Sequence, residues 1–250
     1  RLASGGAAFS AVVKAIATDH HESITVHEFL SYFRDEPWHH HGALSFTDLH
    51  DQCSRAHWGY GEADGPAAWA ALSTKNHLAV EGRYQSPIDL SPAWKGCTMA
   101  KAATKGLALP TPEGPEGPEV APAYGKATGV LVNDGHTVVV QWASGGALTI
   151  GGQRYAVKQF HFHSPSEHTI RGQQFPLELQ VMHTTAAGGL AVLGVLFKEV
   201  PQAEEAEGEA FLSQFWARLP GAPGPATVKA PVDGAALNAA LGGGYYRYEG

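Results

Sequence analysis

The sequence predicts a mainly β domain with a few helices (α+β), built on one large and largely antiparallel sheet, with a small helical appendage before it. From about residue 130 onward, short segments of alternating or continuous apolar residues follow one another with turn residues between them. The chain also contains 30 glycines and 16 prolines among 250 residues, which suits a loop-rich sheet protein better than a helical bundle. A hydrophobic content of 44% is enough for one large domain, alone or with an appendage.

The overall charge and composition exclude several classes of protein. The formal net charge of −7 and the pI near 6.0 give no electrostatic case for binding nucleic acid. No apolar run reaches the ~18 residues that a membrane-spanning helix needs. Cys53 and Cys97 are too few for a disulfide framework or a cysteine zinc site, and they leave a single bridge open. The chain has no initiator Met and no signal peptide, so we expect a processed or trimmed piece.

Residues 1–56 are predicted to form the helical appendage. Phe9, Val12, Val13 and Ile16 recur at helical spacing, and a second short helix is expected over residues 29–34. Residues 57–250 are predicted to form the larger domain. Its first part, residues 57–69, is an aromatic segment that we expect to pack onto the rest of this domain.

Two segments of the appendage, ITVHEF at 24–29 and LSFTDL at 44–49, resemble the ends of EF-hand loops. Ala17 stands where the first loop should begin with Asp, and Glu22 stands where the motif has Gly. The loops are therefore degenerate, and the pattern favours a solvated polar lead-in over a Ca²⁺ site. Histidines 20, 21 and 39–41 leave a soft-metal patch open as another reading.

The predicted sheet elements follow in chain order. Residues 82–90 are a turn and a short extended piece, and residues 110–122 are too rich in Pro, Glu and Gly to be other than a surface loop. Strands are then expected in the following segments: 130–142 around an Asn133-Asp134-Gly135 turn, 147–150, 159–163, 177–182 and 190–198. An acidic loop at 201–209 leads into a helix with one apolar face, formed by Phe211, Leu212, Phe215, Trp216 and Leu219.

A pair of histidines on the predicted strand 159–163 indicates a metal site. Side chains alternate across a strand, so His161 and His163 share one face while Phe160 and Phe162 share the other. Two histidines at this spacing provide two of the three ligands that catalytic zinc takes from a protein. The third donor must come from a neighbouring strand, and 177–182 is the next one along the chain.

A series of motifs follows along the chain in this order: HWGYG, GP-x-x-W, QSPI, N-D-G-H, QFHFH, SEHT, LEL-x-V-x-H and LAVLGVLFK. Over about residues 57–250 this series resembles the α-class carbonic anhydrases. The resemblance implies a zinc enzyme in which a metal-bound hydroxide attacks CO₂, so that CO₂ is reversibly hydrated to bicarbonate. It also implies the site residues by motif position. The metal ligands would be His161 and His163, with Gln180 at the third position. Gln159 and Glu178 would orient these ligands. His136 would be the proton shuttle, since an imidazole titrates near neutrality.

The remaining roles also follow from the resemblance. Glu167 would orient a hydroxyl beside the zinc-bound water, and Tyr60 and Asn133 would order water along the proton path. Met182 and Val192 would line the apolar pocket for CO₂, and Tyr248 would lie near the water network of the zinc.

Two departures from the family pattern shape the expectation for activity. Gln180 stands where the family has its third zinc-binding His; His183 lies three residues on and faces the other side of a strand. An amide oxygen is a weaker donor to zinc than an imidazole, so we expect looser metal binding and weakened activity. The chain also stops at YYRYEG, where the family continues into a Ser-Leu-Thr-Thr-Pro-Pro loop and further strands.

These departures leave a second function open: a non-catalytic carbonic anhydrase-related protein for binding or assembly. A protein partner could then dock through residues 1–56 or through the incomplete C-terminal edge of the sheet. The family is often secreted or housed in an organelle lumen, which is the location that the resemblance suggests.

Overall fold

The computed structural model describes residues 9–18, 65, 67–72, 76, 78–90, 98–99, 120–134, 136–199, 209–216, 218–220, 227–241 and 245–249. The strands are β1 (Phe9–Thr18), β2 (Asp89–Leu90), β3 (Thr98–Met99), β4 (Val120–Tyr124), β5 (Lys126–Asn133), β6 (Val138–Gln141), β7 (Gly146–Ile150), β8 (Gln153–His163), β9 (Thr169–Ile170), β10 (Leu177–Thr184), β11 (Leu190–Glu199), β12 (Thr227–Asp233) and β13 (Tyr246–Glu249). The helices are α2 (Trp69–Leu72), α3 (Leu78–Glu81), α4 (Glu209–Trp216) and α5 (Gly234–Ala240).

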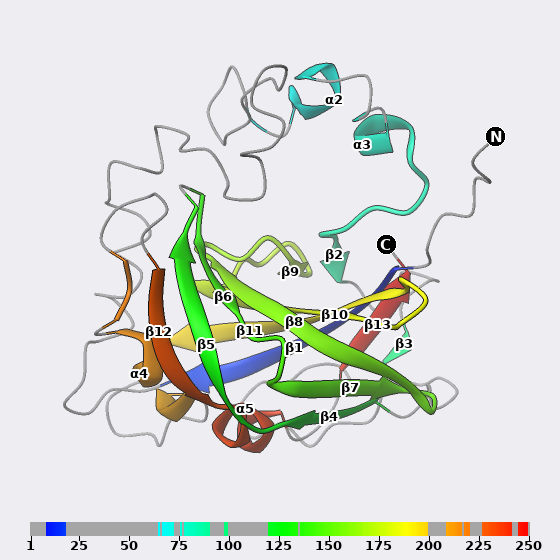
Figure 1. The fold of residues 1–250 in the computed structure, drawn as a ribbon. Coiled ribbons are helices and arrows are strands. Elements are labelled where there is room, and N and C mark those ends of the chain that lie inside the picture. The colour runs from blue at the N-terminus through cyan, green and yellow to red at the C-terminus, as the bar shows by residue number, and fades with distance from the viewer. Residues whose placement is uncertain are drawn as a thin grey trace.

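One curved sheet dominates the described part of the chain, with the strand order β12-β5-β6-β8-β10-β11-β1-β13-β3 (Figure 1). Strands β4 and β7 pair with each other, and β7 also pairs with β8. The pairings of this sheet are antiparallel among the described strands except that of β1 with β11. The predicted class, a mainly β domain on a large and largely antiparallel sheet, is confirmed.

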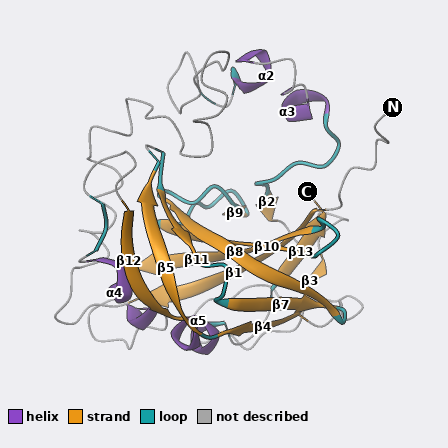
Figure 2. Ribbon diagram, viewed as in Figure 1, coloured by secondary structure: helices purple, strands orange, loops and turns teal. Residues whose placement is uncertain are grey.

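The main hydrophobic core lies between one face of the sheet and helices α4 and α5, which cover that face (Figure 2). Phe160 and Phe162 of β8 point into it, as the alternation predicts, and the Phe160 ring lies 5.2 Å from that of Phe215 in α4. The core-facing residues of β10 and β11 are fully or almost fully buried: Leu177, Leu179, Val181, Leu193, Val195 and Phe197. This aromatic and aliphatic layer fixes the position of the strands that carry the histidines.

The opposite face of β8 and β10 is polar, because every second residue of both strands points there. His161 lies directly opposite Gln180 in the ladder, and His163 lies opposite Glu178. A second, smaller apolar cluster borders this polar face, formed by Leu90, Ile170, Phe175, Leu196, Tyr246 and Tyr248.

Most of the predicted elements are present. β5 ends at Asn133 and β6 begins at Val138, where the sequence predicts a turn. Residues 147–150 fall in β7, and α4 carries the predicted apolar residues Phe211, Leu212 and Phe215 into the core. The predicted surface loop 110–122 is wrong at its end, because residues 120–122 belong to β4, where they pair with β7. Pairing with another strand satisfies backbone groups that composition alone does not reveal.

The predicted helix over Phe9–Ile16 is also wrong, since these residues form strand β1. Val12, Val13 and Ile16 are β-branched and therefore suit an extended chain, and strands β11 and β13 provide backbone partners on both sides. The predictions for residues 29–34, the EF-hand-like segments, the histidines at 20, 21 and 39–41, Cys53 and Cys97, and the division at residue 56 lie outside the described residues. No helix in the described part of the chain is long and apolar enough to cross a membrane.

The interior place of β1, between β11 and β13, predicts that a backbone defect there destabilises the sheet. Val13 pairs with Gly194 of β11 and with Tyr246 of β13, and proline at this position removes an N–H from the ladder. We expect Val13→Pro to lower the free energy of unfolding by about 1–3 kcal/mol in urea denaturation of the full chain. Val13→Ile, which keeps the N–H, is the control. An unchanged midpoint for the proline variant would place residues 9–18 outside the sheet.

Candidate metal centre

The two histidines of β8 lie side by side on the polar face of the sheet, with ring centroids 4.9 Å apart and planes at 78°. The Nδ1 of His161 lies 3.3 Å from the side-chain oxygen of Gln159, an acceptor, so Nδ1 carries the proton and Nε2 keeps its lone pair. The Nε2 atom of His163 is buried and makes no hydrogen bond with any described residue, although Oε2 of Glu167 lies 3.3 Å from it. The lone pair of His161 and the buried ring nitrogen of His163 beside a carboxylate would suit a bound cation.

Burial keeps both imidazoles neutral near pH 7. It lowers the pKa of His161 to about 4, and the neighbouring His163 acts in the same direction, while Asp134, Glu178 and a side-chain hydrogen bond with Gln180 oppose the shift. Burial also lowers the pKa of His163, again against the charge of Glu178. A neutral imidazole is the form that binds a metal, so no proton has to be displaced from either ring at neutral pH.

Gln180, which the resemblance implies as the third ligand, has its amide nitrogen turned toward two carboxylates. Its Nε2 donates one hydrogen bond to Oε2 of Glu167 at 3.1 Å and another to Oε1 of Glu178 at 3.0 Å. Opposite Gln180 on the other neighbouring strand is Gly194, which has no side chain to crowd the amide.

The carboxylate of Glu178 is fully buried and accepts four hydrogen bonds. Its Oε2 accepts from the backbone N–H groups of Glu167 and His168, at 3.0 and 2.9 Å. Its Oε1 accepts from Nδ1 of His168 at 2.6 Å and from Gln180. Burial acts to raise the pKa of Glu178, but the hydrogen bond and charge of His168 outweigh it, so that the net shift is downward and the group is ionised.

A chain of hydrogen bonds continues from this carboxylate away from the site. Nε2 of His168 lies 2.6 Å from the Tyr248 hydroxyl, which in turn lies 2.6 Å from the Ser86 hydroxyl. The Tyr248 hydroxyl thus lies against His168 and Ser86, and the expected place of Tyr248 near the water network of a zinc ion stays a prediction. His168 and Ser86 occur in the SEHT and QSPI motifs, but sequence reasoning gave them no role.

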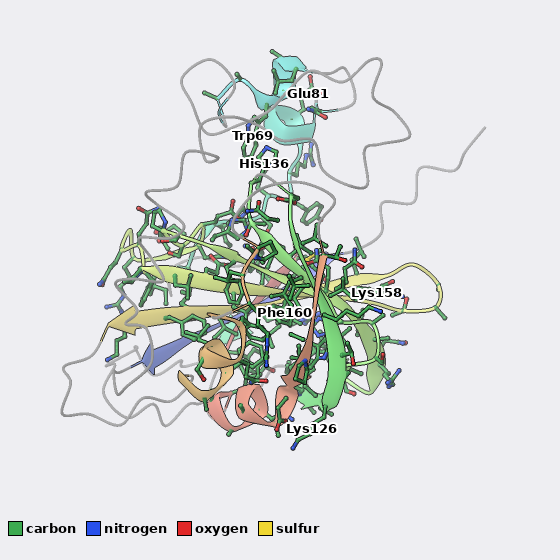
Figure 3. All side chains as sticks on the ribbon, turned by 60° about the vertical axis from the view of Figure 1, so that its left-hand side comes forward. Trp69, Glu81, Lys126, His136, Lys158 and Phe160 are labelled. Carbon is green, nitrogen blue, oxygen red and sulfur yellow. The ribbon has the colours of Figure 1, made fainter. Side chains whose placement is uncertain are left out.

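The proposed proton-shuttle residue lies on the turn between β5 and β6. Oδ1 of Asp134 accepts from the backbone N–H groups of His136 and Thr137, and the Thr137 hydroxyl donates to the carbonyl of Phe162 at 2.6 Å. This last bond ties the turn to the strand between its two histidines. Figure 3 shows His136 at the upper end of the strands, whereas Phe160 lies in the middle of the core.

The other predicted site residues divide into three cases. Asn133 is fully buried and donates to the carbonyl of Pro220 at 3.2 Å. Met182 and Val192 are direct partners in the β10–β11 ladder, and Val192 is buried, which fits an apolar wall next to the histidines. Tyr60 lies outside the described residues. The roles assigned to these residues stay predictions.

The residues present fit a metal ion through two imidazole nitrogens and one amide oxygen. Within the described ranges, no group of three or more His, Cys, Asp or Glu side chains could hold a metal. A metal centre at His161, His163 and Gln180 therefore stays a prediction, and the expected role of Gln180 rests on the family resemblance.

With this geometry in view, comparison with known proteins defines the class. The model of the eukaryotic-type carbonic anhydrase family matches residues 64–250. The chain belongs to this family, and the resemblance to the α-class carbonic anhydrases is confirmed.

Individual relatives agree with this assignment. The carbonic anhydrase of Pectobacterium carotovorum is 32% identical over 218 residues, which cover 84% of this chain and 78% of that protein. The carbonic anhydrase of Pectobacterium atrosepticum is 36% identical over 143 residues, or 57% of this chain, and the chain spans 51% of that relative. Among solved structures, the α-carbonic anhydrase of Thermovibrio ammonificans, in complex with the inhibitor sulfanilamide, has a TM-score of 0.53 at 33% identity, covering 73% of this chain and 71% of that one.

His183, next to the site in sequence but on the core face of β10, predicts how stability depends on pH. Its Nε2 accepts from the Tyr124 hydroxyl at 2.8 Å, its Nδ1 donates to the Ala191 carbonyl at 3.2 Å, and burial lowers its pKa from 6.5 to about 4. Below pH ~6.5 His183 is protonated in the unfolded chain but stays neutral in the folded chain, so the free energy of unfolding falls as the pH drops toward 4.

We expect this group to remove roughly 3 kcal/mol of stability between pH 7 and pH 4. The measurement is urea unfolding across this range for the wild type and for His183→Gln, which is less stable at pH 7 but loses less on acidification. The contribution of His161, whose pKa is also lowered to about 4, is common to both proteins and cancels. Equal losses in the two proteins would contradict a buried neutral His183.

Proposed function

We propose that this protein catalyses the zinc-dependent, reversible hydration of CO₂ to bicarbonate at a centre formed by His161, His163 and Gln180, with weakened activity. The observation that supports the proposal most strongly is the set of acceptor atoms gathered on the polar face of β8 and β10. Two half-buried neutral imidazoles stand beside an amide whose nitrogen already donates two hydrogen bonds, and a carboxylate lies next to them. Such a set attracts a cation.

The chain's own residues would divide the work as follows. When bound, zinc would act as a Lewis acid that makes a water molecule acidic enough to attack CO₂ near neutral pH. Gln159 holds the His161 ring in the tautomer whose Nε2 is free for a metal. Glu178 and Glu167 hold the amide of Gln180.

The apolar pair Met182 and Val192 would receive CO₂, which is uncharged and apolar and gains from a wall without polar groups. Hydration adds the oxygen of water to the carbon of CO₂ and releases one proton. His136, on the turn that Thr137 ties to β8, would carry this proton away from the site.

Activity should be weaker than that of a three-histidine centre for a chemical reason. Zinc is a borderline-soft ion and is bound more tightly by imidazole nitrogen than by a neutral amide oxygen. The metal would therefore be lost more readily, and a fraction of the protein would be without it at limiting zinc.

One observation favours a second function, that of a non-catalytic binding or assembly protein related to the carbonic anhydrases. The amide hydrogens of Gln180 satisfy both Glu167 and Glu178, so the polar network of the site is largely complete without a metal. Such a protein would keep the fold and offer another surface to a partner. The two functions differ in zinc content and in CO₂ hydration rate.

Replacing Gln180 by His tests the proposal. We expect Gln180→His to bind zinc at least roughly tenfold more tightly, or ~1.4 kcal/mol, and to hydrate CO₂ faster than the wild type, which is itself faster than the uncatalysed reaction. Zinc content and stopped-flow hydration rates are measured on the full chain, with His161→Ala as the inactive control. A wild type without zinc and with the rate of water, next to an active Gln180→His, would establish the non-catalytic function instead.

A further inference from the structure

We propose that Glu167 is a positioning residue of the metal centre, which acts with Glu178 to turn the amide of Gln180 so that its oxygen faces the metal. This proposal rests on the proposed function, because it concerns the same centre. It gives Glu167 a partner inside the site, Gln180, in addition to the hydroxyl that the family resemblance implies for it.

The orientation of the Gln180 amide follows from the number of hydrogen bonds that it can donate and accept. A glutamine side chain has two N–H donors on one nitrogen and a single acceptor, the oxygen. The two carboxylate oxygens, of Glu167 at 3.1 Å and of Glu178 at 3.0 Å, use both donors. Since ionised carboxylates only accept hydrogen bonds, a flipped amide would set its oxygen against two anionic oxygens and lose both bonds. The nitrogen therefore points to the carboxylates and the oxygen to the remaining side of the group, where His161 lies opposite it in the ladder.

Of the two carboxylates, Glu178 is the fixed one and Glu167 the adjustable one. Glu178 is fully buried and is held by His168 and by two backbone N–H groups besides Gln180. Glu167 has a side chain that is 24% exposed, and its own backbone N–H donates to Glu178. The three residues thus close a ring of hydrogen bonds: the backbone of Glu167 binds Glu178, Glu178 binds Gln180, and Gln180 binds the side chain of Glu167.

A consequence follows that distinguishes an amide ligand from an imidazole ligand. The NH₂ and O ends of an amide have nearly the same size and shape, so packing does not fix which end faces the metal. Its orientation depends on the hydrogen bonds to both carboxylates. With Glu167 lost, only Glu178 accepts from the amide, so the orientation that directs the oxygen to the metal is favoured less strongly over the turned one, whose N–H groups cannot bind a metal. An imidazole has a ring nitrogen available to a metal while the other ring nitrogen donates to a single carboxylate, so it depends on Glu178 alone. Glu167 should therefore matter for metal binding with Gln at position 180 and hardly at all with His there.

A double-mutant cycle on the full chain tests this dependence. The four proteins are the wild type, Glu167→Leu, Gln180→His and the double variant; each is freed of metal and titrated with Zn²⁺ alone in competition with a chromophoric chelator. We expect Glu167→Leu to weaken zinc binding roughly 10–100-fold in the wild-type background, the usual effect of removing a residue that orients a metal ligand. In the Gln180→His background we expect a change of less than about threefold.

Two matched controls accompany the cycle. Glu81→Gln removes one negative charge at an exposed position of α3 and should leave zinc binding unchanged. Glu167→Gln keeps the size and shape of the side chain and should weaken zinc binding in the same direction as Glu167→Leu but less, because an amide oxygen still accepts from Gln180. If Glu167→Leu unfolds at a lower urea concentration than the wild type, Glu167→Gln takes its place in the cycle.

The outcomes separate this proposal from the proposed function. Equal weakening in both backgrounds, or no weakening in either, would overturn the positioning role of Glu167 while leaving a zinc centre in place. A wild type that binds no zinc, next to a Gln180→His variant that does, would overturn the proposed function and the positioning role with it. Loss confined to the glutamine background is the result that supports the proposal.

Discussion

The buried carboxylate of Glu178 is the interaction on which the site depends. A fully buried anion is costly unless it is paired and hydrogen-bonded, and this one accepts four hydrogen bonds from three different residues. Those bonds fix the loop after β8 through its backbone, hold the ring of His168, and orient Gln180. Through His168 the same carboxylate is connected to Tyr248 on β13, so it joins distant strands as well as the residues of the site.

The sheet gives this network its rigidity because the two faces of each strand serve different purposes. Phe160 and Phe162 pack against α4, and the histidines between and beyond them can point only to the other face. A slip of the register by one residue would bury the histidines and expose the phenylalanines, which the core does not permit. The positions of His161, His163 and Gln180 are therefore set by packing on the far side of the sheet.

Sequence patterns predicted the parts of this arrangement that depend on local periodicity. The shared face of His161 and His163 and the strand that carries Gln180 follow from alternation, and the family resemblance placed Gln180 at the third ligand position. Contacts between distant segments could not be predicted in this way: Ser86 and Tyr248 are 162 residues apart. The helix predicted over β1 is wrong because Phe9, Val12, Val13 and Ile16 fall at helical spacing, whereas the pairing with β11 and β13, which decides the structure, leaves no local pattern. The use of both amide hydrogens of Gln180 depends on the exact direction of two carboxylates, which no pattern specifies.

The most direct measurement is an anomalous difference map from crystals of the full chain grown with zinc, recorded on both sides of the zinc absorption edge. The account predicts one strong peak within bonding distance of Nε2 of His161, Nε2 of His163 and the side-chain oxygen of Gln180. The amide nitrogen of Gln180 should still donate hydrogen bonds to Glu167 and Glu178. The absence of a peak between these residues at saturating zinc would contradict the central claim. A peak bonded to Glu167 in place of Gln180 would contradict it equally.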